Sequence, residues 1–134
     1  MSKLVDIEGI GPAYAEKLQA AGVTTVEKLL EHGATKKGRD TIADGSGIEY
    51  ARILKFVNHA DLMRIKGIGG EYAELLEAAG ADSVPELAAR KPENLHTKLV
   101  EVNETKKLVR QVAAASQVAD WVEQAKALPR IVTH

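Results

Sequence analysis

The sequence predicts an all-α fold organised around a stretch that occurs twice. Placing residues 4–29 on residues 62–87 pairs 14 identical residues in 26 positions, which indicates an internal duplication. Apolar residues recur at helical spacing through most of the chain, and strand-like alternation is scarce. Alanine and leucine are abundant, while aromatic residues make up 4% of the composition. These observations favour a helical protein made of two related halves.

Each copy begins with a Gly-Ile-Gly turn, at residues 9–11 and again at residues 67–69. Two glycines around an isoleucine allow φ values that other residues resist. The isoleucine can therefore tuck beneath a tight turn, while the glycines let the backbone come close to another molecule.

A short helix is expected after each turn. Its apolar face comprises residues 14, 15, 18 and 21 in the first copy, and residues 72, 73, 76 and 79 in the second. Pro12 suits the first helical position, and Gly22 and Gly80 lie where a C-cap is expected. Thr24 and Ser83, each followed three residues later by glutamate, predict capping boxes that open the next helix.

Helical spacing predicts further helices around residues 26–30, 48–57, 95–102, 108–112 and 118–128, for about nine or ten short helices in all. The last should begin with Ser116 as its N-cap, contain Trp121 as a core residue, and stop at Pro129. The basic run Lys36-Lys37-Gly38-Arg39 is predicted to be a loop with a solvated face, followed by a break at residues 45–47.

The absence of a flexible linker between the copies predicts one joint core. We therefore expect residues 1–134 to form a single compact domain. Residues 1–59 would hold the first repeat with its supporting helices, and residues 60–134 the second.

The residues at both turns resemble the helix-hairpin-helix motif of DNA repair, recombination and replication proteins. The resemblance rests on Gly9-Ile10-Gly11-Pro12-x-x-Ala15-x-Lys17-Leu18 and on Gly67-Ile68-Gly69-x-x-x-Ala73-x-x-Leu76. It covers roughly residues 3–31 and 61–89, and it implies two hairpins related by a pseudo-twofold axis. The whole chain also resembles an uncharacterised bacterial domain family built from duplicated units of this kind.

This resemblance implies sequence-independent binding of DNA phosphates by backbone amides, as an accessory module in DNA metabolism. Open N–H groups at a turn and at a helix start attract anions, and such contacts are salt-sensitive and ignore base identity. The implied phosphate-binding residues are Gly9, Ile10, Gly11, Ala13 and Lys17 in the first copy, and Lys66, Gly67, Ile68, Gly69 and Gly70 in the second. Leu75 replaces the lysine in the second copy.

Some turns of the resembled family also bind a monovalent cation through backbone carbonyls. In this chain those carbonyls would belong to Val5, Ile7 and Ile10, and to Met63, Ile65 and Ile68.

The charge balance supports an alternative function. The chain has 18 basic and 19 acidic residues, for a net charge of −1, whereas dedicated nucleic-acid binders are usually basic. Asp6 and Glu8 flank the first turn, and Glu71 and Glu74 follow the second, so carboxylates would compete with phosphate for the same N–H groups. The alternative is a protein-interaction or self-association module that keeps the fold without binding DNA.

Catalysis has little support in the sequence. The four histidines, His32, His59, His96 and His134, lack the spacing of a metal pair, and there is no cysteine. No cluster of carboxylates suggests a two-metal nuclease. We therefore expect no enzyme activity, no metal site and no further cofactor. Without a signal peptide or a membrane span in the sequence, a cytoplasmic location is expected.

Overall fold

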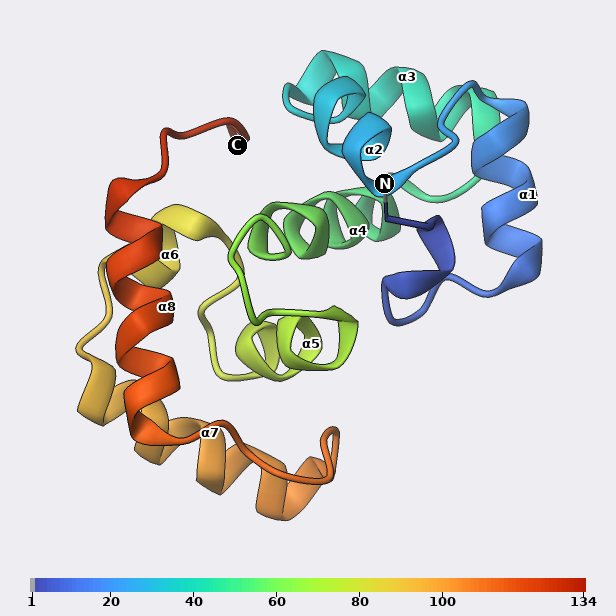
Figure 1. Cartoon of the computed structure of the whole chain (residues 1–134). Coiled ribbons are helices and arrows are strands. Elements are labelled where there is room, and N and C mark those ends of the chain that lie inside the picture. The colour runs from blue at the N-terminus through green and yellow to red at the C-terminus, as the bar shows by residue number, and fades with distance from the viewer. Residues whose placement is uncertain (1) are drawn as a thin grey trace. The chain divides into compact units, whose positions relative to one another are not determined.

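The computed structural model describes residues 2–134, and within them it contains helices and no strands (Figure 1). This confirms the all-α prediction. The elements are the 3₁₀-helix η1 (Leu4–Asp6) and the α-helices α1 (Pro12–Ala20), α2 (Val26–His32), α3 (Lys36–Ser46), α4 (Tyr50–Leu62), α5 (Gly70–Ala78), α6 (Val84–Ala88), α7 (Pro92–Lys106) and α8 (Ala115–Ala127). None of these helices is long and apolar enough to cross a membrane.

The chain divides into two compact units. The first unit holds the chain up to Asp61 together with Ile131–His134, and the second unit is Leu62–Arg130. The predicted boundary between residues 59 and 60 lies inside α4, close to the start of the second unit. A core shared by both units stays a prediction.

The helices after the two turns end in the same way. Gly22 follows α1 with a φ of +89°, and Gly80 follows α5 with a φ of +93°, as the C-cap prediction requires. The next residues, Val23 and Ala81, each donate a 2.9 Å hydrogen bond back to the last turn of the helix. This is the bonding pattern of a Schellman motif, and it fixes where the chain leaves each helix.

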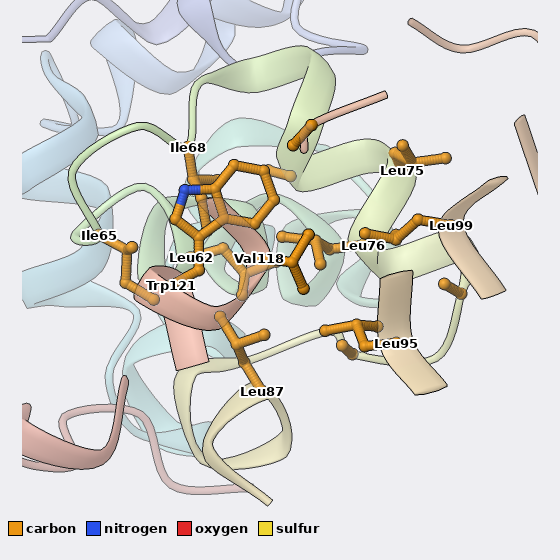
Figure 2. Packing of buried hydrophobic residues seen from close by; sticks show 14 of the residues in the cluster. Leu62, Ile65, Ile68, Leu75, Leu76, Leu87, Leu95, Leu99, Val118 and Trp121 are labelled. Carbon is orange, nitrogen blue, oxygen red and sulfur yellow. The ribbon is translucent and has the colours of Figure 1, made fainter. Parts of the chain in front are cut away.

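Two helices bury a stripe of identical spacing. In the first unit, α4 buries Ile53, Phe56, Val57 and Ala60; in the second unit, α8 buries Val118, Trp121, Val122 and Ala125. Figure 2 shows Trp121 among the leucines and isoleucines of the second unit's core. Its side chain is 1% exposed, which confirms Trp121 as a core residue.

The basic run is helical rather than a loop, which corrects the prediction. Its residues form the first turn of α3, because the Thr35 hydroxyl accepts a 3.1 Å hydrogen bond from the Gly38 N–H and caps the helix. A side chain at Gly38 would collide with the backbone carbonyl of His32. Glycine therefore marks the close approach of α3 to the end of α2, and not a flexible segment.

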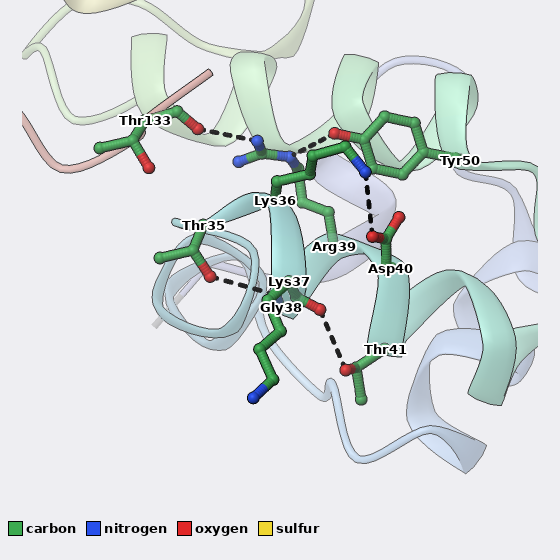
Figure 3. A network of polar contacts seen from close by, with 9 residues as sticks. All are labelled: Thr35, Lys36, Lys37, Gly38, Arg39, Asp40, Thr41, Tyr50 and Thr133. Atoms are coloured by element: carbon green, nitrogen blue, oxygen red, sulfur yellow. Dashed lines mark hydrogen bonds and ion pairs between the residues drawn. The ribbon is translucent and has the colours of Figure 1, made fainter.

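Arg39, within that run, is a core residue with 1% exposure. Its guanidinium donates to the carbonyls of Gly33 (2.9 Å), Ala34 (3.2 Å) and Thr133 (2.7 Å), and to the Tyr50 hydroxyl (3.1 Å), as Figure 3 shows in part. The buried charge is thus met by oxygen acceptors. The contact with Thr133 holds the last residues of the chain on the first unit.

Two element boundaries in the second half differ from the predictions. Residues 108–114 are not helical: α7 ends before Lys107, which has a φ of +52°, and the Asn103 side chain makes two 3.0 Å hydrogen bonds to the backbone of Val109. The amide of Asn103 therefore takes the place of helical backbone bonds. In α8 the N-cap is Ala114, not Ser116, and its N–H donates to Gln117 Oε1 at 3.2 Å.

The cap of α2 lies one residue later than predicted. Thr25, not Thr24, accepts a 3.1 Å hydrogen bond from the Lys28 N–H. In the second unit Ser83 caps α6 as predicted, with a longer bond of 3.4 Å from the Glu86 N–H. Aligning the two copies pairs Thr25 with Ser83, so the alignment itself indicates the correct position of the cap in the first copy.

Candidate functional site

The two Gly-Ile-Gly turns have the same backbone geometry. Gly9 and Gly67 have φ values of +91° and +99°, in the region that only glycine adopts readily. The N–H groups of Ile10 and Ile68 each donate a 3.1 Å hydrogen bond to the carbonyl three residues earlier, and both side chains are 4% exposed. Each isoleucine thus anchors its turn to the core and uses its own amide within the turn.

Each turn leads into a helix start without a side-chain cap. Gly11 is the N-cap of α1 and Gly69 is the N-cap of α5, and their carbonyls accept the first helical bonds, at 3.0 and 2.9 Å. In residues 2–134, no backbone acceptor serves the N–H groups of residues 13 and 14, or of residues 70–72. The second turn therefore offers one more open amide than the first, because Pro12 has none.

Gly11 and Gly69 need not be glycine for any reason internal to the protein. Their φ values are −88° and −97°, which any residue adopts, and a Cβ placed on either would meet nothing within 4 Å. Both residues are exposed. Glycine thus occupies both helix starts although the protein's own conformation and packing do not require it. Without a side chain at these positions, the open amides stay uncovered.

An aromatic ring lies beneath the first turn and connects it to two cations. A Cβ on Gly9 would lie 3.5 Å from the Phe56 ring, and Phe56 packs edge-on against Tyr14 with ring centroids 5.9 Å apart. Lys17 Nζ and Arg52 Cζ lie 5.9 and 5.2 Å from the Tyr14 centroid. Within the described residues neither cation pairs with a carboxylate.

Trp121 occupies the corresponding place beneath the second turn. Its Nε1 would lie 2.9 Å from a Cβ on Gly67, and its ring packs against Tyr72 with centroids 5.1 Å apart. The Tyr72 hydroxyl donates to the Gln111 carbonyl at 2.9 Å, which brings the loop after α7 to the turn. An open pocket results, lined by Gly67, Gly69, Gly70, Glu71, Tyr72, Val109, Arg110 and Gln111.

The backbone of Lys66 is held by α8. Its N–H donates to Gln124 Oε1 at 3.0 Å, and its carbonyl accepts from Gln124 Nε2 at 3.1 Å. The Lys66 amide is therefore occupied within the protein, and the residue can offer a ligand only its exposed side chain.

The carboxylates near the turns differ in their arrangement. Asp6 Oδ2 accepts a 3.0 Å hydrogen bond from the Lys3 N–H, so this group caps η1 rather than facing the turn. Glu8 and Glu71 are exposed, and Glu74 is half-buried. Among the described residues, no three histidine, aspartate or glutamate side chains gather to hold a metal ion.

Two of the six carbonyls suggested for a monovalent cation already accept a hydrogen bond within their turn. Those of Ile7 and Ile65 accept the hydrogen bonds from the isoleucine amides of their turns.

Sequence reasoning missed three groups that the fold brings to the turns: Arg52, Arg110 and the indole N–H of Trp121. Arg52 lies one helical turn before Phe56 on α4, and no local pattern indicates that this stretch packs beside Tyr14. Arg110 lies in a segment predicted to be helical. For Trp121 the sequence did contain a signal, because the spacing of the apolar residues in its helix matches the spacing in α4, where Phe56 occupies the same place.

Comparison with known proteins found one family. A family model described as a domain of unknown function, DUF4332, matches residues 8–128, which include both turns and the eight α-helices of the described residues. The comparison with curated proteins and the comparison with solved structures each found no match.

Proposed function

This chain belongs to the family of the domain of unknown function DUF4332, a membership that names no activity, and we propose that it binds DNA without sequence specificity. Two helix-hairpin-helix units, produced by duplication, would each hold a backbone phosphate at the open amides of a Gly-Ile-Gly turn. The protein would then serve as an accessory module in DNA metabolism and not as an enzyme.

The observation that carries this proposal is the pair of glycines at the helix starts. Gly11 and Gly69 are dispensable for backbone conformation and for internal packing, yet both leave a row of open N–H groups exposed. By contrast, α2, α3 and α6 begin with a threonine or serine cap. An unobstructed helix N-terminus stabilises a phosphate through its donors and its dipole.

The local charge at the turns is more favourable than the net charge of −1 suggests. Lys17 and Arg52 lie at the first turn. At the second turn Arg110 lines the pocket, and the exposed Lys66 directly precedes Gly67 in the sequence. Basic side chains beside amide donors strengthen phosphate binding by charge-assisted hydrogen bonds. The opposing charges are Glu8 at the first turn and Glu71 with the half-buried Glu74 at the second, so moderate affinity is expected.

The test is a titration that measures binding of a labelled DNA duplex at low and at moderate salt, with fluorescence anisotropy as the readout. The decisive variant is Gly11→Asp with Gly69→Asp, which places a capping carboxylate over the open amides. Because aspartate is a good N-cap, the helices should be unchanged or more stable by about a few tenths of a kcal/mol. Affinity for the duplex should fall by roughly tenfold or more, since the donors are occupied and a negative charge is added.

A matched control is Gln19→Glu with Asn94→Asp. It adds the same two negative charges at exposed positions, one in each unit and both outside the turns. The control should lose much less affinity than the glycine variant. Equal losses would show that only net charge matters, and binding that is insensitive to salt would exclude a phosphate-dominated interaction.

The alternative is a protein-interaction or self-association module. It is favoured by Val5, which is 49% exposed and lines a pocket with Leu4, Ala15 and Thr25 beside the first turn. Sedimentation of the parent and of Val5→Ser decides this point. A concentration-dependent dimer that Val5→Ser dissociates, together with no binding of the duplex, would favour the alternative.

A further inference from the structure

The second turn contains a hydrogen-bond donor that the first turn lacks. Beneath Gly9 lies the hydrocarbon ring of Phe56, whereas beneath Gly67 lies the indole nitrogen of Trp121. In Figure 2 the nitrogen edge of the indole faces the turn that carries Ile65 and Ile68. The two units therefore place aromatic rings alike but differ in what the ring can donate.

This indole N–H has no acceptor within the described residues. The Trp121 side chain is 1% exposed, yet its N–H donates to none of the described groups. The nitrogen is also not one of the fully buried polar atoms that lack a partner, so it keeps contact with solvent. Buried tryptophans usually place this N–H on an acceptor. Here the acceptor has to come from solution, on the side of Gly67.

The surroundings of the nitrogen suit an anionic oxygen. Gly67 lines the open pocket of the second turn, together with the start of α5 and with Arg110 of the loop after α7, and the indole nitrogen lies next to Gly67. The open amides of residues 70–72 supply further donors at a helix of nine residues. The Arg110 side chain is exposed and forms no ion pair within the described part of the chain. Glu71 is the one carboxylate among the lining residues.

We propose that the pocket at the second turn binds a phosphate group whose oxygens accept hydrogen bonds from the Trp121 indole N–H and from the amides at the start of α5, with Arg110 as counter-charge. This inference rests on the proposed phosphate-binding role of the turns and makes the second turn the more specialised of the two. The phosphate is either part of a DNA backbone or a free phosphate, and the ligand oxygens are chemically the same in both cases.

The chain contains a single tryptophan, so the indole N–H gives one assignable NMR signal. Labelled with ¹⁵N, the protein is titrated with inorganic phosphate and, separately, with a short duplex. The indole signal should shift saturably with phosphate, together with the amide signals of Gly70 and Glu71. Arg110→Gln should weaken phosphate binding by roughly tenfold, because it removes a charge-assisted contact. Lys98→Gln, which removes an exposed charge of the second unit outside the pocket, should leave the titration unchanged.

Trp121→Phe removes the N–H and keeps an aromatic ring, as in the first unit. If its circular dichroism matches the parent, phosphate binding followed at the Gly70 amide should weaken roughly tenfold. If the variant is not folded, the indole titration of the parent and of Arg110→Gln decides alone. An indole signal that stays fixed while the Gly70 and Glu71 amides move would overturn the proposal, as would the absence of any shift up to high millimolar phosphate.

The two arms separate this inference from the proposed function. A duplex that binds while the indole signal stays fixed would leave DNA binding to the first turn and remove Trp121 from it. An indole signal that responds to inorganic phosphate in a protein that binds no duplex would uphold the phosphate site and remove DNA as its ligand.

Discussion

Substituting alanine for the first glycine of each turn should have unequal effects, although the two turns have the same backbone shape. Gly9 and Gly67 both have positive φ, so a Cβ at either position costs about 1–3 kcal/mol in backbone strain. The reduced entropy of the unfolded chain offsets about 0.4–1 kcal/mol of this in both cases. These two contributions are shared, and they cancel when the two variants are compared.

The difference between the variants comes from the ring beneath each turn. The new Cβ on Gly9 would lie 3.5 Å from Phe56, an ordinary contact, whereas on Gly67 it would lie 2.9 Å from Trp121 Nε1. Trp121 is tightly packed and has to move, which costs about 1–3 kcal/mol as overpacking. Gly67→Ala should therefore lower the free energy of unfolding by about 1–3 kcal/mol more than Gly9→Ala does.

Urea unfolding followed by circular dichroism measures both variants against the parent. In a Trp121→Phe background, where the ring beneath Gly67 resembles that beneath Gly9, the excess cost should fall to within about 0.5 kcal/mol of zero. An equal cost of the two alanine variants in the parent background, or an excess that survives Trp121→Phe, would refute the steric explanation.

Three further stability predictions use the same urea assay. Arg39→Met should cost about 3–5 kcal/mol because it leaves three carbonyls and a hydroxyl without their donor; Lys36→Met, on the exposed side of the same helix, should stay within about 0.5 kcal/mol, and a similar cost for both would contradict a core role for the guanidinium. Thr25→Ala should cost about 1 kcal/mol and Thr24→Ala much less; the reverse order would restore the cap to the earlier threonine. Asn103→Ala should cost about 1–3 kcal/mol, since it frees both backbone groups of Val109; no measurable loss would show that the loop after α7 does not depend on this side chain.

Local sequence patterns correctly predicted the elements whose hydrogen bonds and packing involve residues close together in the sequence. Pro12 at the start of α1, Gly22 and Gly80 after their helices, and the buried stripe of α8 all follow from chemistry within one or two turns. The all-α class follows from the same periodicity. Within the turns, the positive φ of Gly9 and Gly67 confirms the reason for a glycine at the first position. The same reason does not hold for the second glycine, because Gly11 and Gly69 have φ values that any residue adopts.

The predictions were wrong where a residue distant in sequence, or an unusual side-chain hydrogen bond, determines the local structure. The basic run reads as a solvated loop until Arg39 is seen to meet carbonyls from two separate segments, one of them 94 residues away. Residues 108–112 have helical spacing, but the Asn103 side chain holds Val109 in another conformation. For the candidate site, the residues of the turns could be predicted from sequence, whereas Arg52 and Arg110 depend on which segments pack beside them.

The order in which the chain is made has a consequence for its assembly. The second unit is one continuous stretch, so every residue it needs is present once Arg130 has been synthesised. The first unit also requires Ile131–His134, whose Thr133 accepts a hydrogen bond from Arg39. The half that emerges first from the ribosome is therefore the half that is completed last, and until then one of the three carbonyl partners of its buried guanidinium is missing.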